Sequence, residues 1–437
     1  MKLIAIQNFE FDWKLWLALT GAMLVPKIYE MNRVWLVGAM DMSALAIVEQ
    51  YKFIELIVEI LNESFPIAIL SLISQNPSRK EALSLLKTAA VFVASISFLL
   101  MLGIWFGASY LVNSIGSTPS ISNVTREYLR IRGVGLIFDV LFLVAFMGLK
   151  ARQQGWACIG VMAIGCFASA VVDNFLYGIN RFSLGLGVVG VAIGYAVFKF
   201  ILFGCAWIAL LKSYNSTFHS FCKVRWSFHR KIFKISKYSG LDSLVRNGVY
   251  IFILTILNSL GILEYGGYGL AMSLIWCGLI PVLALGECAS VSLGVVYSGN
   301  ERERIFVVFR SLFIVLAGLL TTLIAGGFFG TQIVSMFNDH HEIVFYSEKA
   351  YQFLLIPYVC FSCGLIVKSI FIGTGNVKYV FLVSLVVAAS VSLPGIVCYS
   401  CGLWSPHFEE IMLFLGCGMI VDFFCSSYFA YLLLKRI

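Results

Sequence analysis

Residues 212–237 read KSYNSTFHSFCKVRWSFHRKIFKISK, which is the only long stretch of the chain that is plainly not apolar. The stretch lies near the middle of the chain and contains no Asp or Glu. Its basic residues are Lys212, Lys223, Arg225, Arg230, Lys231, Lys234 and Lys237. Such a block is usually a solvated linker, and in a membrane protein it stays on the cytoplasmic side. We therefore expect a cytoplasmic linker at 212–237 between an N-terminal half, 1–211, and a C-terminal half, 238–437.

The composition excludes a soluble globular domain. Hydrophobic residues make up 60% of the chain and charged residues 12%, whereas soluble domains have about 25% charged residues. The net charge of +8 follows from Lys and Arg in cytoplasmic loops, so it requires no nucleic-acid partner. The twelve Cys lie mostly in apolar segments without the paired spacing of a zinc site. We expect a polytopic membrane protein with no metal and no cofactor.

Apolar windows predict the membrane-spanning helices, each of which needs roughly 20 mostly apolar residues. Twelve such windows can be drawn, so we predict twelve spans. They are 15–37, 45–73, 86–113, 128–149, 156–178, 185–211, 238–261, 267–297, 305–336, 348–373, 378–402 and 409–434. With the linker inside, most loops rich in Lys and Arg also lie inside. The sequence thus predicts that both termini are cytoplasmic.

The two halves of the sequence align with each other. At a constant offset of 225 residues (373 minus 148), Gly148 meets Gly373 and Arg79 meets Arg304. Each half then contains six helices, and because six is even, both halves enter the membrane in the same orientation. We therefore predict an all-α polytopic membrane protein with twelve transmembrane helices, in two six-helix lobes related by pseudo-two-fold symmetry.

Several short motifs carry a family resemblance. Residues 173–178, DNFLYG, are followed by LGVVGVAI at 186–193, and GLKAR occupies the short loop at 148–152. Further segments are LVG at 36–38, ALA at 44–46, SLP at 392–394 and GLW at 402–404. Together these motifs resemble the multidrug and toxic compound extrusion (MATE) family, within the larger group that also contains polysaccharide-lipid flippases.

The resemblance implies a two-lobed exporter that exchanges a small organic substrate for protons or sodium ions. In many members of the family, an acidic residue in the first helix and another in the fifth bind the coupling cation. Asp173 matches the second position, whereas Arg33 stands at the first. Ser169 stands one turn before Asp173, where the family often has Asn.

The first two predicted helices concentrate charge inside the membrane, where each charge costs several kcal/mol unless it is paired or faces water. On the first helix Lys27, Glu30 and Arg33 are spaced by three residues. On the second helix a stripe follows one face, at spacings of three, four and four residues. It consists of Lys52, Glu55, Glu59 and Glu63. These residues either form a neutralising network, with Lys27, Arg33 and Lys52 balancing the acids, or supply carboxylates for a coupling ion or polar substrate.

Other intramembrane charges are isolated along the chain. Asp173 and Asp139 are candidate cation or proton sites, and Asp139 is expected to pair with a basic residue of the first two helices. Asp242 and Arg246 lie four residues apart with Tyr250 one turn further, a spacing that favours an internal ion pair over ligands. Lys199 and Lys368 are expected to extend their ammonium groups to the membrane interface.

The leading prediction is a secondary active transporter, not an enzyme, that exports an organic molecule by cation-coupled antiport between two rocking lobes. The coupling ion is H⁺ or Na⁺, the partners are membrane lipid and a small organic substrate, and the chain is expected to be a monomer in the plasma membrane (the inner membrane in a bacterium). One alternative is a flippase for a lipid-linked saccharide, in which Lys27, Arg33 and Lys52 would hold a diphosphate. Another is a non-transporting membrane scaffold.

Overall fold

The computed structural model describes residues 12–38, 40, 42–76, 78–114, 122–178, 181–214, 227–298, 302–328, 330–335 and 341–436. All regular secondary structure in these ranges is helical. Nine of the helices described there are long and apolar enough to cross a membrane. The predicted all-α membrane fold is confirmed.

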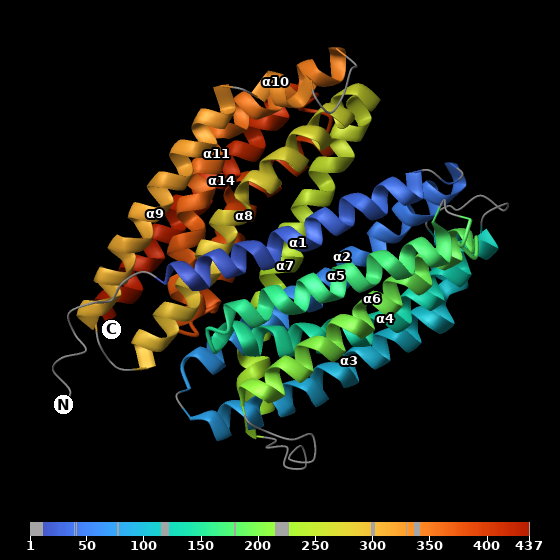
Figure 1. The fold of residues 1–437 in the computed structure, drawn as a ribbon. Coiled ribbons are helices and arrows are strands. Elements are labelled where there is room, and N and C mark those ends of the chain that lie inside the picture. The colour runs from blue at the N-terminus through green and yellow to red at the C-terminus, as the bar shows by residue number, and fades with distance from the viewer. Residues whose placement is uncertain are drawn as a thin grey trace. The chain divides into compact units, whose positions relative to one another are not determined.

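The chain divides into two compact units (Figure 1). One unit, the N-lobe, comprises Gly21–Ser236, and the other, the C-lobe, comprises the chain from Lys237 onward together with the described residues before Gly21. The helix α1, Trp13–Gly38, is thus divided between the two units. Within the C-lobe, Trp16 at its start donates a hydrogen bond from Nε1 to the carbonyl oxygen of Pro281, at 2.9 Å.

The N-lobe contains most of α1 and five further helices. These are α2 (Met42–Ser74), α3 (Arg79–Ser114), α4 (Ser122–Ala151), α5 (Gly155–Tyr177) and α6 (Gly187–Ser213). The central helix is α4, which packs against α2, α3 and α6. Its buried residues Tyr128, Leu129 and Leu136 share an apolar core with Val191 of α6, and burial of such side chains is the main stabilising contribution to packing between these helices.

The C-lobe repeats this order. Its helices are α7 (Ser227–Leu260, which starts in the N-lobe range), α8 (Ile262–Ser298), α9 (Arg302–Phe328), α10 (Gly330–Ser335), α11 (His341–Gly373), α12 (Lys378–Val387), the π-helix η3 (Ala388–Ser392), α13 (Leu393–Ser400) and α14 (Phe408–Arg436). Here α11 packs against α8, α9 and α14, which are the counterparts of α2, α3 and α6 at an offset of 225 residues (373 minus 148). The same helix pairs therefore contact in each lobe, as the internal repeat predicts.

Several helices extend beyond the predicted windows. The seventh begins at Ser227 and not at 238, so the last part of the basic stretch is helical, while residues 215–226 of the predicted linker lie outside the described structure. The third begins at Arg79 and not at 86. Hydropathy reports the apolar slab that a helix crosses, whereas a helix can continue into water.

The repeated glycines at the ends of α4 and α11 have different neighbours. A Cβ added at Gly373 would lie 2.8 Å from the backbone oxygen of Ser290, whereas one added at Gly148 would meet only leucine methyl groups, at 2.9 Å. Side chains can move aside more easily than backbone. We expect Gly373→Ala to destabilise the protein by about 1–3 kcal/mol and Gly148→Ala to cost less. The midpoint temperature of unfolding in detergent tests this order, and equal midpoints would contradict it.

Candidate functional site

Asp173 lies in the last two turns of α5 and is completely buried. Its Oδ2 accepts a hydrogen bond of 2.7 Å from the hydroxyl of Tyr29, a buried residue of α1. Tyr177, one turn further along α5, lies beside the same carboxylate, and the charge of Arg33 acts on it. The first and fifth helices thus meet at one acidic group in the interior of the N-lobe.

The helix α6 closes the other side of this carboxylate. Gly194 lies so close that a Cβ there would be 2.3 Å from Oδ1 of Asp173. Among the described residues, neither that oxygen nor the buried Ser169 hydroxyl one turn earlier has a hydrogen-bond partner. The carboxylate therefore has one strong donor and one oxygen that is held in a close-packed position.

A matched pair of substitutions on α6 tests this packing. Gly194→Ala is expected to lower the midpoint temperature of unfolding, because its methyl group must displace the Asp173 carboxylate. Gly204→Ala is expected to leave the midpoint unchanged or raise it slightly, because nothing lies within 4 Å of the added Cβ and Ala favours the helix by up to about 1 kcal/mol. Equal midpoints for the two variants would show that α6 does not confine the carboxylate.

Arg33 extends from α1 towards α6. One guanidinium N–H donates to the carbonyl oxygen of Val191 at 3.3 Å, and Cζ lies 5.5 Å from the centre of the Tyr195 ring. At the position where the resemblance implies an acid, the structure therefore has a fixed positive charge near Asp173.

A second carboxylate, Asp139 of α4, lies deeper along α6. It is buried and forms an ion pair of 2.5 Å with Lys199. The hydroxyl of Tyr195 donates to its Oδ2 at 3.2 Å, and the amide of Asn62 on α2 donates to the same oxygen at 3.4 Å. The expectation that Asp139 pairs with a base of the first two helices is wrong, and so is the expectation that Lys199 extends to the interface. The partner comes from α6, since α4 and α6 are packed together.

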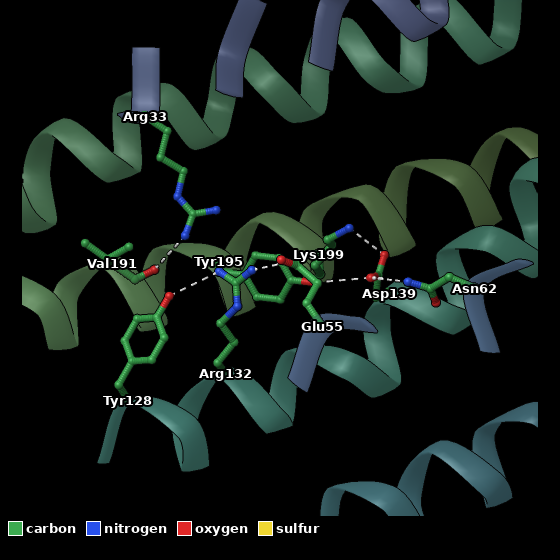
Figure 2. Close-up of polar contacts among 9 residues, drawn as sticks. All are labelled: Arg33, Glu55, Asn62, Tyr128, Arg132, Asp139, Val191, Tyr195 and Lys199. Carbon is green, nitrogen blue, oxygen red and sulfur yellow. Dashed lines mark hydrogen bonds and ion pairs between the residues drawn. The ribbon is translucent and has the colours of Figure 1, made fainter. Parts of the chain in front are cut away.

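The third ion pair joins α2 to α4. Arg132 donates to Oε1 of Glu55 at 3.0 Å, and the guanidinium lies 3.8 Å from the centre of the Tyr195 ring. Figure 2 shows Arg33, Arg132 and Lys199 around this one tyrosine. Favourable cation–π contacts of this kind are worth about 0.5–2 kcal/mol each. Tyr195 is therefore the centre of the polar interior of the N-lobe.

The other predicted N-lobe charges lie apart from this interior. Lys27 and Glu30 pair with each other at 2.7 Å, with side chains that are 58% and 61% exposed. Glu59 is exposed and Glu63 partly buried on α2, while the side chain of Lys52 lies outside the described structure. Of the predicted network, only Arg33 and Glu55 join the polar interior around Tyr195, where their partners come from α4 and α6.

The predicted C-lobe residues form a smaller cluster. Asp242 is buried and accepts a hydrogen bond from the Ser384 hydroxyl of α12. The nearest guanidinium nitrogen of Arg246 is 4.0 Å away, the outer limit of an ion pair, while Tyr250 follows one turn later on α7. Elsewhere in this lobe Lys368 pairs with Asp422 of α14 at 2.7 Å, so the expectation that Lys368 extends to the interface is also wrong.

Comparison with known proteins identifies the family. A family model described as MatE matches residues 19–176 and 239–397, and thus both halves of the chain. The chain belongs to the MatE family. The resemblance is therefore confirmed, and the chain is an integral membrane protein. Named relatives in this family are export proteins, which agrees with the expectation that the chain is not an enzyme.

Two relatives of this MatE chain illustrate the distance within the family. The probable multidrug resistance protein NorM of Agrobacterium fabrum is 23% identical over 59% of this chain and 56% of its own length. The multidrug export protein MepA of Staphylococcus haemolyticus is 25% identical over 51% of this chain and 49% of its own length. The chain therefore spans about half the length of the relatives it matches.

Solved structures match the MatE chain over a longer range. The Vibrio cholerae MATE transporter VcmN, in its bent form, has a TM-score of 0.84 at 14% identity, covering 97% of this chain and 96% of that one. A transporter of the MOP superfamily from Pyrococcus furiosus, described as having a binding pocket of reverse polarity, has a TM-score of 0.85 at 15% identity, covering 97% and 95%. At these identities the matches show the MATE fold.

Four side chains of this interior were missed by the sequence analysis. They are Tyr29, Arg132, Tyr195 and Lys199 as partners of carboxylates. Arg132 and Lys199 carried a usable signal, because each is a charge inside an apolar helix. Tyr29 lies one turn before Arg33 on α1, whereas nothing in its surroundings separates Tyr195 from the many other aromatic residues.

Proposed function

We propose that the protein is a secondary active transporter that exports an organic small molecule in exchange for a cation. MatE family membership supports transport. The observation that carries the coupling is the fully buried Asp173, hydrogen-bonded by Tyr29 from another helix. A buried ionisable residue within the membrane is a functional candidate because its burial is costly.

The coupling cation in this proposal is the proton. A hard metal cation needs several oxygen ligands arranged around it. At Asp173 one oxygen already accepts from Tyr29, Gly194 packs against the other, and Arg33 brings a positive charge. A carboxylic acid can carry a proton without additional space or ligands. Protonation of Asp173 would shift the conformational equilibrium through the differential affinity of the two states for the proton.

The proposed cycle places substrate and proton movements in a rocking motion of the two lobes, with the linker and both termini on the cytoplasmic side. The lobes correspond to the expected halves at 1–211 and 238–437. We propose that the protein acts as a monomer in the plasma membrane, which would be the inner membrane of a bacterium.

Export of a lipid-linked saccharide is the second candidate. Arg33, Arg132 and Lys199 favour it, because guanidinium and ammonium groups bind diphosphates. Two of these bases, however, already pair with Glu55 and Asp139, and the third lies near Asp173. The interior therefore has a carboxylate for each base, and this balance favours the exporter.

Proteoliposomes test the proposal directly. Purified protein is reconstituted with an imposed pH gradient or an imposed sodium gradient, and uptake of a fluorescent organic cation is compared with uptake of a short-chain lipid-linked saccharide. We expect dye transport driven by the pH gradient alone. Transport driven only by sodium would overturn the proton assignment, saccharide transport would establish the flippase, and no transport of either compound would favour a scaffold.

A further inference from the structure

Three helix ends of the N-lobe bring basic and aromatic side chains together. Arg79 begins α3, Arg152 follows the end of α4, and Tyr214 follows the end of α6. The guanidinium carbon of Arg152 lies 5.3 Å from the centre of the Tyr214 ring. The charges of Arg152 and Arg79 both act on the Tyr214 hydroxyl. This group, Arg79, Arg152 and Tyr214, is called the basic corner.

The Tyr214 hydroxyl has no hydrogen-bond partner within the described part of the chain. The residue is only 7% exposed, and a buried polar group without a partner is rare in native structures because it loses its bonds to water. Burial raises the pKa of Tyr214, although Arg152 and Arg79 oppose the rise, so the hydroxyl remains a donor at neutral pH. It is therefore a donor that still needs an acceptor.

The charges of the basic corner are also uncompensated. No ion pair of Arg79 or Arg152 occurs among the residues that the structure describes. The nearby Glu81 instead accepts a hydrogen bond from Asn76. Lys80 and Lys212, both exposed, add positive charge next to Arg79 and Tyr214. A hydroxyl donor between two guanidinium groups matches the acceptor oxygens and negative charge of a phosphate group.

We propose that the basic corner binds the phosphate of an anionic lipid headgroup. Its residues lie just beyond the ends of membrane-spanning helices, at the level where headgroups lie. Trp156, near the start of α5, is 68% exposed at the same end of the lobe, as is typical of an aromatic residue at the interface. Basic pockets between helices on the cytoplasmic side are the expected place for such lipids.

The test measures thermal unfolding of the full-length protein in detergent. Phosphatidylglycerol, phosphatidylcholine or inorganic phosphate is added to the wild type, Tyr214→Phe, Arg152→Gln and the control Arg230→Gln, an exposed arginine near the start of α7. Phosphatidylglycerol is expected to raise the wild-type midpoint by about 2–4 °C more than phosphatidylcholine does. Arg230→Gln should keep this difference, and Tyr214→Phe and Arg152→Gln should lose most of it.

Tyr214→Phe makes the test independent of folding damage. With phosphatidylcholine alone its midpoint should equal or exceed that of the wild type, because the substitution removes an unsatisfied buried hydroxyl. A lower midpoint there would show that the hydroxyl has a protein partner and would overturn the proposal. An equal gain from inorganic phosphate would assign the site to a soluble anion instead of a lipid, and the absence of any phosphatidylglycerol effect on the wild type would refute the site.

Discussion

Asp173→Asn is expected to abolish transport driven by a pH gradient while leaving the protein folded. The amide has nearly the shape of the carboxylate and can still accept the hydrogen bond from Tyr29, but it cannot take up or release a proton near neutrality. Because a coupled exporter without its proton site has no driving reaction, we expect the initial rate of dye uptake in proteoliposomes to fall by at least roughly tenfold, which corresponds to about 1.4 kcal/mol.

Two controls separate coupling from damage. Glu127→Gln removes an exposed carboxylate from α4 and should transport like the wild type. Facilitated exchange of labelled dye at equal pH on both sides should survive in Asp173→Asn, because substrate binding and rocking remain. If Asp173→Asn kept uphill transport at the wild-type rate, the proton would have to bind elsewhere, and the buried Asp139 would be the next carboxylate to substitute.

Lys199→Met is expected to destabilise the protein strongly. It leaves the buried carboxylate of Asp139 without its ion-pair partner, and breaking a buried pair from one side typically costs about 3–5 kcal/mol. The hydrogen bonds from Tyr195 and Asn62 would remain but bring no positive charge. We therefore expect a lower midpoint temperature of unfolding in detergent and a reduced yield of folded protein.

The double variant Asp139→Asn with Lys199→Met provides the decisive comparison. Removing both charges eliminates the unpaired carboxylate, so the double variant should recover most of the lost stability, and the two effects should be strongly non-additive. Lys27→Met is the matched control, since it breaks the exposed pair with Glu30 and such pairs contribute little. Additive effects of the two buried substitutions would mean that Asp139 and Lys199 do not depend on each other.

The sequence predicted the fold well because the membrane imposes a strong pattern. Apolar windows and the offset between Gly148 and Gly373 require no knowledge of tertiary contacts, and each predicted span overlaps a described helix. Helix ends were less accurate, as at Ser227 of α7, because a basic helix that leaves the membrane resembles a linker in composition alone.

The candidate site was predicted only in part. Asp173 was identified by its motif and by the cost of burying it, both of which are local properties of α5. The partners of Asp139 and Glu55 were not predicted, because Lys199 and Arg132 lie on other helices and depend on which faces meet. Spacing along one helix groups side chains on a face, but it cannot show which neighbouring helix that face contacts.

The two lobes carry one ion pair of opposite polarity. In the N-lobe the acid, Asp139, is on α4 and the base, Lys199, on α6, whereas in the C-lobe the base, Lys368, is on α11 and the acid, Asp422, on α14. If the halves arose by gene duplication, this difference blocks reversion, because any single exchange back toward the ancestral residue sets like charges against each other in an apolar interior. The two copies have thus become evolutionarily non-interchangeable, and the paired positions should change together among descendants.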